Sequence, residues 1–284
     1  MHSGNSVLIT GASTGIGKAC ALLLDRLGYQ VFAGVRKAQI GQGLEAEASE
    51  RLTSVILDIT RPEQIAGAVE TVKEASGANK GLAGLVNNAG IAVAGPIEFL
   101  PIADLRRQLE VNVIGQIAVT QAFLPLLRRS HGRIVNISSA INRFALPFLG
   151  AYCASKFTMQ ILTDSLRREL APWNIHVSII EPGVIETPIW DKSYAAADAI
   201  GAGLPPRAKE LYAEFFSTGR GFIEKFRRRA VSPEAVAKTV RRCLETRRPK
   251  SRYIVGSGAR LPKLIATFVP DRLVDWGVRK VLKF

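Results

Sequence analysis

The chain has 284 residues, of which 47% are hydrophobic and 22% are charged. A chain of this length and composition can bury a sizeable core, which excludes a disordered or fibrous protein. Its three cysteines and three histidines are scattered without metal-ligand or disulfide spacing, so we expect no metal site and a reducing, cytoplasmic location.

Short apolar runs alternate with segments of helical periodicity along the chain. The runs that predict buried strands centre on Val7, Val31, Val55, Leu85, Ile134, Val177 and Tyr253. The helical segments cover residues 15–28, 62–76, 101–129, 150–172 and 232–246, with a weaker one at 38–50. This alternation predicts an α/β fold, a single Rossmann-type doubly wound domain over residues 1–284, with seven parallel strands and helices on both faces. Right-handed crossovers then bring the carboxyl ends of the strands to one edge.

The first predicted strand is followed by a glycine-rich turn and a helix. Gly11, Gly15 and Gly17 lie between the apolar run 6–10 and a helical segment that stops at Gly28. Glycines in this place let the backbone turn tightly and approach a pyrophosphate, which binds at the helix amino terminus. The spacing is Thr-Gly-x-x-x-Gly-x-Gly rather than G-x-G-x-x-G, and it predicts a dinucleotide site.

A serine, a tyrosine and a lysine near the middle of the chain suggest acid–base chemistry. Tyr152 and Lys156 are four residues apart, so they share one helix face. A free phenol titrates near pH ~10, and a neighbouring ammonium lowers its pKa toward a useful range. Ser139 follows a buried strand, where its hydroxyl can hold a substrate oxygen. Taken alone, the Tyr152–Lys156 pair fits a solvated helix face equally well.

Together these motifs resemble the short-chain dehydrogenase/reductase family over about residues 5–190. The further matching elements are Asp58, Asn87–Gly90, Asn112 and Pro182–Thr187. The resemblance implies hydride transfer between nicotinamide and a carbonyl carbon, with Tyr152 as proton donor or acceptor. It also implies that Lys156 lowers the phenol pKa and binds the nicotinamide ribose, that Ser139 bonds the substrate oxygen, and that Asn112 holds a water linking Lys156 to solvent.

The same resemblance implies a set of cofactor contacts. They are Gly11, Ser13, Thr14, Gly15, Ile16, Gly17, Arg36, Lys37, Asp58, Ile59, Asn88, Ala89, Gly90, Tyr152, Lys156, Pro182, Gly183, Ile185 and Thr187. Val35 stands where family members that prefer NAD usually carry Asp, and two cations follow it, which favours NADP(H) over NAD(H). In the alternative, Arg36 stacks on adenine and Lys37 is solvated. Ser13 and Thr14 count against NADP(H), because many NADP-binding members have a basic residue in that turn.

The stretch after the nicotinamide turn, residues 189–230, corresponds to the substrate lid of this family. It is rich in aromatic and aliphatic residues: Trp190, Tyr194, Leu204, Leu211, Tyr212, Phe215, Phe216, Phe222 and Phe226. The opposite wall is expected from residues 141–148. Both walls are largely apolar, which favours a lipophilic alcohol or carbonyl substrate, retinoid-, steroid- or lipid-like, as in the retinol and hydroxysteroid dehydrogenase branch that the pattern resembles. Alternatively, these aromatics only pack the lid.

Two other functions stay open at this point. One is an NAD-dependent dehydrogenase of a small hydroxy acid, and the other is a non-catalytic nicotinamide-binding protein. A mere binding protein has no need of Ser139, so the intact set of catalytic residues favours an enzyme.

Positive charge is concentrated at the end of the chain. Residues 207–284 hold 20 Lys and Arg against 7 Asp and Glu, which is 13 of the net +14. Within them, the tail 259–284 alternates apolar and basic residues and suits an amphipathic helix at an anionic membrane. A solvated surface that aids solubility explains the charge equally simply, and the same tail can instead cover the substrate cleft or a subunit interface. Without a recognised nucleic-acid module, nucleic-acid binding is not expected.

The sequence also predicts location and assembly. The first strand starts within about seven residues of Met1, which leaves no room for a signal peptide. No charge-free run reaches the ~20 residues of a membrane-spanning helix. We therefore expect a cytoplasmic protein, with peripheral membrane contact through the tail as an open alternative. The family resemblance implies a homodimer or homotetramer formed by helices 101–129 and 150–172.

Overall fold

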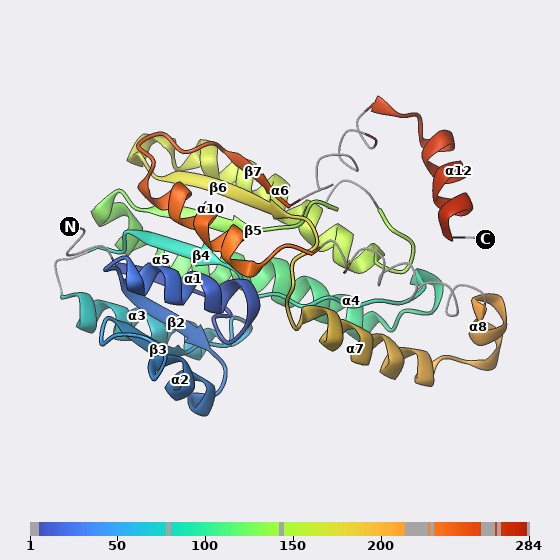
Figure 1. Cartoon of the computed structure of the whole chain (residues 1–284), viewed down its shortest axis with the longest axis horizontal. Helices are drawn as coiled ribbons and strands as arrows, with labels where there is room; N and C mark the ends of the chain where they lie inside the picture. The colour runs from blue at the N-terminus through green and yellow to red at the C-terminus, as the bar shows by residue number, and fades with distance from the viewer. Residues whose placement is uncertain are drawn as a thin grey trace.

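A computed structural model describes residues 6–77, 81–141, 145–213, 227, 230–256, 265 and 268–282. Seven parallel strands form one sheet in the order β3-β2-β1-β4-β5-β6-β7, with helices on both sides (Figure 1). The strands are β1 Ser6–Ile9, β2 Gln30–Val35, β3 Leu52–Ile56, β4 Gly84–Asn87, β5 Arg133–Ile137, β6 His176–Pro182 and β7 Arg252–Val255. The predicted doubly wound sheet of seven parallel strands is confirmed.

Two apolar layers hold the helices on the sheet. Helices α1 (Gly15–Arg26), α2 (Ala38–Glu45) and α10 (Pro233–Glu245) contribute to the core layer on one face. Helices α3 (Pro62–Ser76) and α5 (Gln116–Ser130) contribute to the layer on the other. Successive strand residues alternate between the layers, as the pleat requires: Val7 and Ile9 lie in the first, and Leu8 in the second.

The predicted helix over 101–129 is made of three pieces. Helix α4 (Ile102–Leu109) passes into a π-helical turn, η2 (Glu110–Gly115), and then into α5. Among the described residues, the segment Ile102–Ser130 is the one helix long and apolar enough to cross a membrane by composition. Phe123, Leu126 and Leu127 on it are buried in the core against the sheet, so its apolar character is explained by packing.

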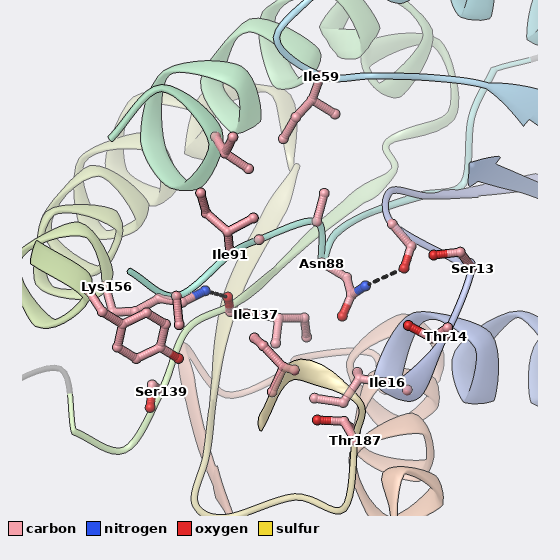
Figure 2. A pocket seen from close by; sticks show the side chains of 18 of the residues that line it. Ser13, Thr14, Ile16, Ile59, Asn88, Ile91, Ile137, Ser139, Lys156 and Thr187 are labelled. Atoms are coloured by element: carbon pink, nitrogen blue, oxygen red, sulfur yellow. Dashed lines mark hydrogen bonds between the residues drawn. The ribbon is translucent and has the colours of Figure 1, made fainter. Parts of the chain in front are cut away.

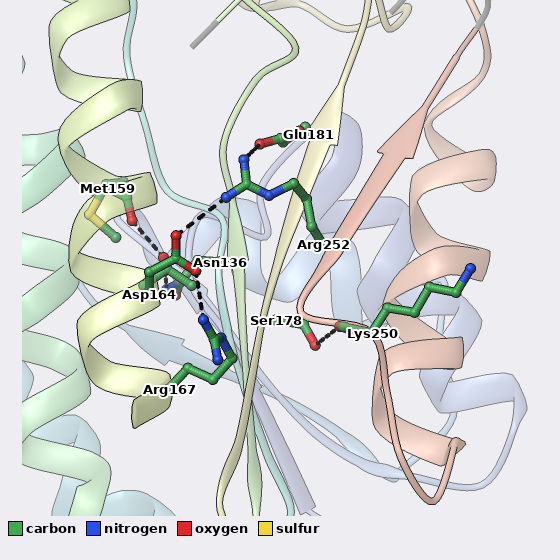
Figure 3. A network of polar contacts seen from close by, with 9 residues as sticks. Asn136, Met159, Asp164, Arg167, Ser178, Glu181, Lys250 and Arg252 are labelled. Carbon is green, nitrogen blue, oxygen red and sulfur yellow. Dashed lines mark hydrogen bonds and ion pairs between the residues drawn. The ribbon is translucent and has the colours of Figure 1, made fainter. Parts of the chain in front are cut away.

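An ion cluster in which Glu181 is buried and the other side chains are partly exposed joins the edge strand β7 to the sheet and to α6 (Gly150–Glu169) (Figure 3). The Arg252 guanidinium on β7 donates to Glu181 Oε1 on β6 at 2.8 Å and lies 3.4 Å from Asp164 Oδ2 on α6. The other Asp164 oxygen accepts from Arg167 at 3.1 Å. Glu181 is fully buried, and the Arg252 guanidinium beside it compensates its charge.

The remaining helices extend beyond the sheet. Helices α7 (Ile189–Gly203) and α8 (Pro206–Leu211) form an arm that projects past the carboxyl ends of the strands (Figure 1). Helix α12 (Asp271–Leu282) lies near that end of the molecule, away from the sheet. Within the basic region 207–284, residues 225–229 and 257–267 lie outside the described residues, apart from Arg227 and Ile265.

Candidate active site

One large cavity of about 1570 Å³ opens at the carboxyl ends of the strands. Its walls come from the segments that follow β1 to β6 and from α6, so residues far apart in sequence share one site (Figure 2). The expected site residues that line it are Gly11, Ser13, Thr14, Gly15, Ile16, Arg36, Lys37, Asp58, Ile59, Asn88, Ala89, Gly90, Ser139, Tyr152, Lys156, Pro182, Gly183, Ile185 and Thr187. Gly17 and Asn112 are the two expected site residues behind the wall.

The glycine turn has the shape of a phosphate cradle. Gly11 and Gly15 have φ of +66° and +55°, the left-handed region that favours glycine. A Cβ on Gly15 would lie 2.9 Å from Thr187 Cγ2, and a Cβ on Gly17 would lie 2.3 Å from the Gly11 carbonyl oxygen. No side chain fits at any of these places without displacement. The bare backbone therefore faces the cavity at the amino terminus of α1, which fits a dinucleotide pyrophosphate.

Asn88 and Thr10 fix this cradle from behind. The Asn88 side-chain amide donates to the carbonyl oxygens of Thr10 and Gly11, both at 3.0 Å (Figure 2). The Thr10 hydroxyl accepts from the backbone N–H groups of Asn88 and Ala89, also at 3.0 Å. These four bonds lock the turn after β1 to the turn after β4, so Asn88 supports the cradle, while its expected contact with the cofactor stays a prediction.

The end of β2 is positively charged where it meets the cavity. Val35 is buried, while Arg36 and Lys37 are exposed and line the opening. Across from them, burial alone raises the pKa of the Asp58 carboxyl, but hydrogen bonds from the Thr60 N–H and hydroxyl hold it below its usual range. Arg36 adds to that lowering. Asp58 thus stays ionised and fixed by Thr60 at the cavity wall.

Ser139, Tyr152 and Lys156 meet at the inner end of the cavity. Ser139 stands just beyond β5, and Tyr152 and Lys156 lie one turn apart on α6. A hydrogen bond joins the Ser139 hydroxyl and the Tyr152 phenol. The Lys156 Nζ lies 5.8 Å from the centre of the tyrosine ring and donates to the Ile137 carbonyl oxygen at 2.9 Å. A hydroxyl, a phenol and an ammonium thus line the same part of the cavity.

The titration behaviour of this group differs from the sequence expectation. Burial raises the pKa of the Tyr152 phenol to about 12, and the bond from Ser139 offsets only part of this effect. Burial lowers the pKa of the Lys156 ammonium to about 8. The pKa of the phenol is therefore raised where the sequence predicted a lowering, because removal from water outweighs the hydrogen bond from Ser139.

Asn112 supports the site from the π-helical turn. Its Oδ1 accepts from the Ile91 N–H at 2.9 Å, and its Nδ2 donates to the Ile91 carbonyl at 3.0 Å and to the Ser155 hydroxyl at 3.1 Å. A Cβ on Gly90 would lie 3.3 Å from Asn112 Oδ1 and 3.7 Å from Lys156 Nζ, so both side chains border Gly90. The side-chain amide is thus engaged with protein atoms, and the expected water link stays a prediction.

Apolar side chains line the part of the cavity where the lid and its opposite wall were expected. Ile141 belongs to the expected stretch 141–148, Leu149 follows that stretch directly, and Ile189 and Trp190 belong to α7. The Trp190 indole is fixed by a 2.8 Å bond to the Ile185 carbonyl oxygen. Four aromatics of the expected lid lie outside the described residues: Phe215, Phe216, Phe222 and Phe226. Residues 142–144 of the expected opposite wall also lie outside them.

Sequence reasoning missed several lining residues. The ones that stand out by charge or bulk are Thr60, Ile91, Arg106, Arg107, Glu110 and Val111. Four of them belong to α4 and the π-helical turn, which the periodicity presented as one regular helix. The charged residues Arg106, Arg107 and Glu110 were the available sign that this segment reaches the cavity. The same charges also fit a solvent-exposed helix face.

Comparison with known proteins defines the class. Residues 5–198 match the model of the short chain dehydrogenase family. The chain belongs to this family of oxidoreductases, and it is an enzyme of the alcohol dehydrogenase and carbonyl reductase kind.

Particular relatives narrow the branch. The chain is 40% identical over 275 residues to retinol dehydrogenase 5 of Mus musculus, covering 95% of this chain and 86% of the relative. It is 38% identical over 278 residues to 17-beta-hydroxysteroid dehydrogenase type 6 of Bos taurus, with the same coverage of each chain. A short chain dehydrogenase of Burkholderia cenocepacia, solved in complex with NADP, superposes with a TM-score of 0.72 at 26% identity over 95% of this chain and 96% of that one.

Proposed function

We propose that this enzyme transfers a hydride between NADP(H) and a lipophilic alcohol or carbonyl compound. The observation that carries the proposal is the single cavity in which the phosphate cradle of Gly11 and Gly15 lies in line with Ser139, Tyr152 and Lys156. Gly11 and Gly15 would hold the cofactor pyrophosphate at the amino terminus of α1, and Tyr152 and Lys156 would border its nicotinamide.

The residues at the inner end then have distinct roles. When bound, NADP(H) supplies or accepts the hydride. Tyr152, which holds its proton at neutral pH, donates it to the substrate oxygen as the carbonyl is reduced, and takes it back in oxidation. Ser139 donates a hydrogen bond to the same oxygen, which matters most as negative charge develops there. Lys156 is largely protonated at neutral pH and adds positive charge beside the phenol.

The preference for NADP(H) rests on the end of β2. A carboxylate after β2 would bind a ribose 2′-hydroxyl and repel a phosphate, but Val35 occupies that position and Arg36 and Lys37 line the cavity beside it. Guanidinium groups suit phosphate particularly well because they bind it with two parallel hydrogen bonds. These two side chains are exposed at the cavity edge and available to a 2′-phosphate.

A lipophilic substrate is supported by the walls of the cavity and by the relatives. Ile141, Leu149, Ile189 and Trp190 present apolar surface next to Ser139. Relatives with 38–40% identity carry names of retinol and hydroxysteroid dehydrogenases. Retinol and hydroxysteroids, the compounds in these names, are bulky apolar alcohols. An apolar pocket with a few polar groups at one end suits such molecules.

Nucleotide titration tests the cofactor proposal. Binding of NADPH and NADH is followed by nicotinamide fluorescence for the wild type and the variant Arg36→Ala/Lys37→Ala. We expect the wild type to bind NADPH at least about tenfold more tightly, and the variant to lose most of that difference. Arg61→Ala is the control, because Arg61 is an exposed cation near Asp58 that does not line the cavity. Equal affinities in the wild type would overturn the NADP(H) preference.

We also propose a homo-oligomer formed through η2 and α6. Ile114, Phe157 and Ile161 on these segments are 53%, 43% and 53% exposed, which is unusual for large apolar side chains. A second copy of the chain would cover them, as the helices 101–129 and 150–172 were expected to do. Light scattering of Ile161→Glu tests this: the variant should run at half or less of the wild-type mass, and an unchanged mass would exclude α6 from the interface.

A third proposal concerns helix α12 and membranes. Leu273 and Trp276 are 59% and 62% exposed, and Lys280 lies 5.0 Å from the Trp276 ring. Apolar groups beside Lys and Arg suit the surface of an anionic bilayer. The enzyme should float with vesicles containing phosphatidylglycerol, and Leu273→Glu/Trp276→Glu should abolish flotation while leaving NADPH binding intact. Absence of wild-type flotation would contradict peripheral membrane contact.

A further inference from the structure

The base and the tip of the α7–α8 arm make hydrogen bonds of different character. At its base, the Trp190 indole donates to the Ile185 carbonyl within the segment that leads into α7. At its tip, Tyr212 follows α8 and reaches the loop before α4: its hydroxyl donates to Glu98 Oε2 at 2.9 Å. The tip contact joins residues 114 positions apart, so it ties the tip of the arm to a segment that is distant in sequence.

Three aromatic rings surround the tip contact. The Tyr212 ring meets Phe148 edge to face at a centroid distance of 5.4 Å and Phe99 at 6.0 Å. Edge-to-face packing at these distances is favourable beyond simple burial. We call Glu98, Phe99, Phe148 and Tyr212 the clasp. Glu98 is exposed and the three rings are only partly buried, so water can compete for the contact and the clasp can open.

The clasp is connected to the cavity through Phe148. This residue has φ of +66°, which is rare and strained for a bulky side chain, and its carbonyl accepts from the Gly95 N–H at 2.8 Å. Its two neighbouring segments both reach the cavity: Leu149 lines it directly, and Ala94 lines it next to Gly95. The conformation that exposes the Phe148 ring to Tyr212 therefore also sets where Leu149 stands in the cavity wall.

The middle of the arm adds an apolar contact at the same place. Ile200 on α7 packs against the buried cluster of Val93, Leu100 and Ala151, the last of which lies one residue before Tyr152. The arm thus spans the loop 91–100 and the start of α6. Both of these segments contribute residues to the cavity wall, among them Ala94 and Tyr152.

We propose that the clasp is a specificity-determining device: closure by Tyr212 holds Phe148 and Leu149 in place and completes the wall that contacts a bulky substrate. This inference rests on the proposed function only in assuming that carbonyl compounds are the substrates. A small carbonyl compound reaches Ser139 and Tyr152 without touching this wall. A bulky one gains its binding energy from it, so loss of the clasp raises KM for the bulky substrate selectively.

Graded variants of Tyr212 test the proposal. Tyr212→Phe removes the hydrogen bond to Glu98 and keeps the ring, whereas Tyr212→Ala removes both. For a polycyclic ketone we expect KM to rise about threefold in the first and about tenfold or more in the second, with kcat within about twofold. KM for a small ketone should stay within about twofold in both variants. Tyr253→Phe is the control, because it also removes one phenolic hydrogen bond, to the Lys250 N–H at 2.9 Å, from a site away from the clasp.

A second measurement needs no substrate. Hydrogen exchange of residues 206–212 in the NADPH complex should be faster in Tyr212→Ala than in the wild type, and unchanged in Tyr253→Phe. Equal loss of activity toward small and bulky ketones, or unchanged exchange in Tyr212→Ala, would overturn the clasp. Inactivity of the wild type toward both ketones, with faster exchange in Tyr212→Ala, would contradict the proposed function and leave the clasp supported as an arm contact.

Discussion

Lys156 gives the sharpest quantitative prediction, because burial of its positive charge lowers the free energy of unfolding. In the folded protein its pKa is about 8, against an ordinary value of 10.5, as a result of burial. At roughly 1.4 kcal/mol per pH unit, this difference means that the charged lysine lowers the free energy of unfolding by about 3 kcal/mol. Lys156→Met removes that cost, and it also removes the bond to the Ile137 carbonyl, worth about 1 kcal/mol.

The nucleotide-free variant should therefore be more stable than the wild type by about 2 kcal/mol at neutral pH, while losing turnover. The sign of the pH dependence follows from proton binding. Below pH 8 both folded and unfolded wild type hold the proton, and the full cost is present. Between 8 and 10.5 the unfolded chain holds more protons than the folded one, so wild-type stability rises relative to the variant.

Urea unfolding at a series of pH values from neutral to 10.5 measures this difference directly, with circular dichroism as the signal. Lys73→Met is the control, because Lys73 forms an exposed ion pair with Glu70 on α3. Its effect should be small at every pH. Parallel stability curves for wild type and Lys156→Met would refute the reasoning, since they would mean that the Lys156 charge is not desolvated in the folded protein.

Three other predictions follow from single contacts. Ser139→Ala should lower kcat by about tenfold to a hundredfold and shift the pH–rate profile of alcohol oxidation upward, because the Ser139 bond lowers the pKa of Tyr152; an unshifted profile would argue against that bond. Gly17→Ala should weaken NADPH binding in fluorescence titration by at least about tenfold, since its Cβ meets the Gly11 carbonyl at 2.3 Å, whereas Gly43→Ala, which meets nothing within 4 Å, should not. Arg252→Leu should lower the free energy of urea unfolding by about 3 kcal/mol by removing the cation 2.8 Å from the buried Glu181 carboxylate, and adding Glu181→Leu should restore most of it.

Much of the fold follows from local sequence because its strands are short, apolar and bounded by turn residues. Each strand near Val7, Val31 and Val55 has its centre buried on the sheet, where a continuous apolar run is required. The glycine turn could be predicted from the sequence for a related reason. The backbone has positive φ at Gly11 and Gly15, which glycine adopts far more easily than other residues. The glycines in the sequence therefore predict this turn geometry.

Features that depend on contacts between residues distant in sequence could not be predicted from the sequence. Asn112 lies in the π-helical turn, and its side chain bonds the backbone of Ile91, which is 21 residues earlier. Helical periodicity does not predict a contact between residues so far apart in sequence. The clasp likewise depends on Tyr212 meeting Glu98 and Phe148 across the arm. The direction of the Tyr152 pKa shift was missed because spacing reveals a neighbouring cation but not how completely water is removed from the phenol.

The central claim is that Tyr152 exchanges a proton with a carbonyl substrate while NADPH gives the hydride. The most direct measurement is single-turnover oxidation of bound NADPH on mixing with a lipophilic ketone, for wild type and Tyr152→Phe. The account predicts rapid oxidation by the wild type, a rate at least about a hundredfold lower in the variant, and NADPH affinities within about twofold of each other. Equal rates in the two proteins would contradict the assignment of Tyr152, and so the mechanism built on it.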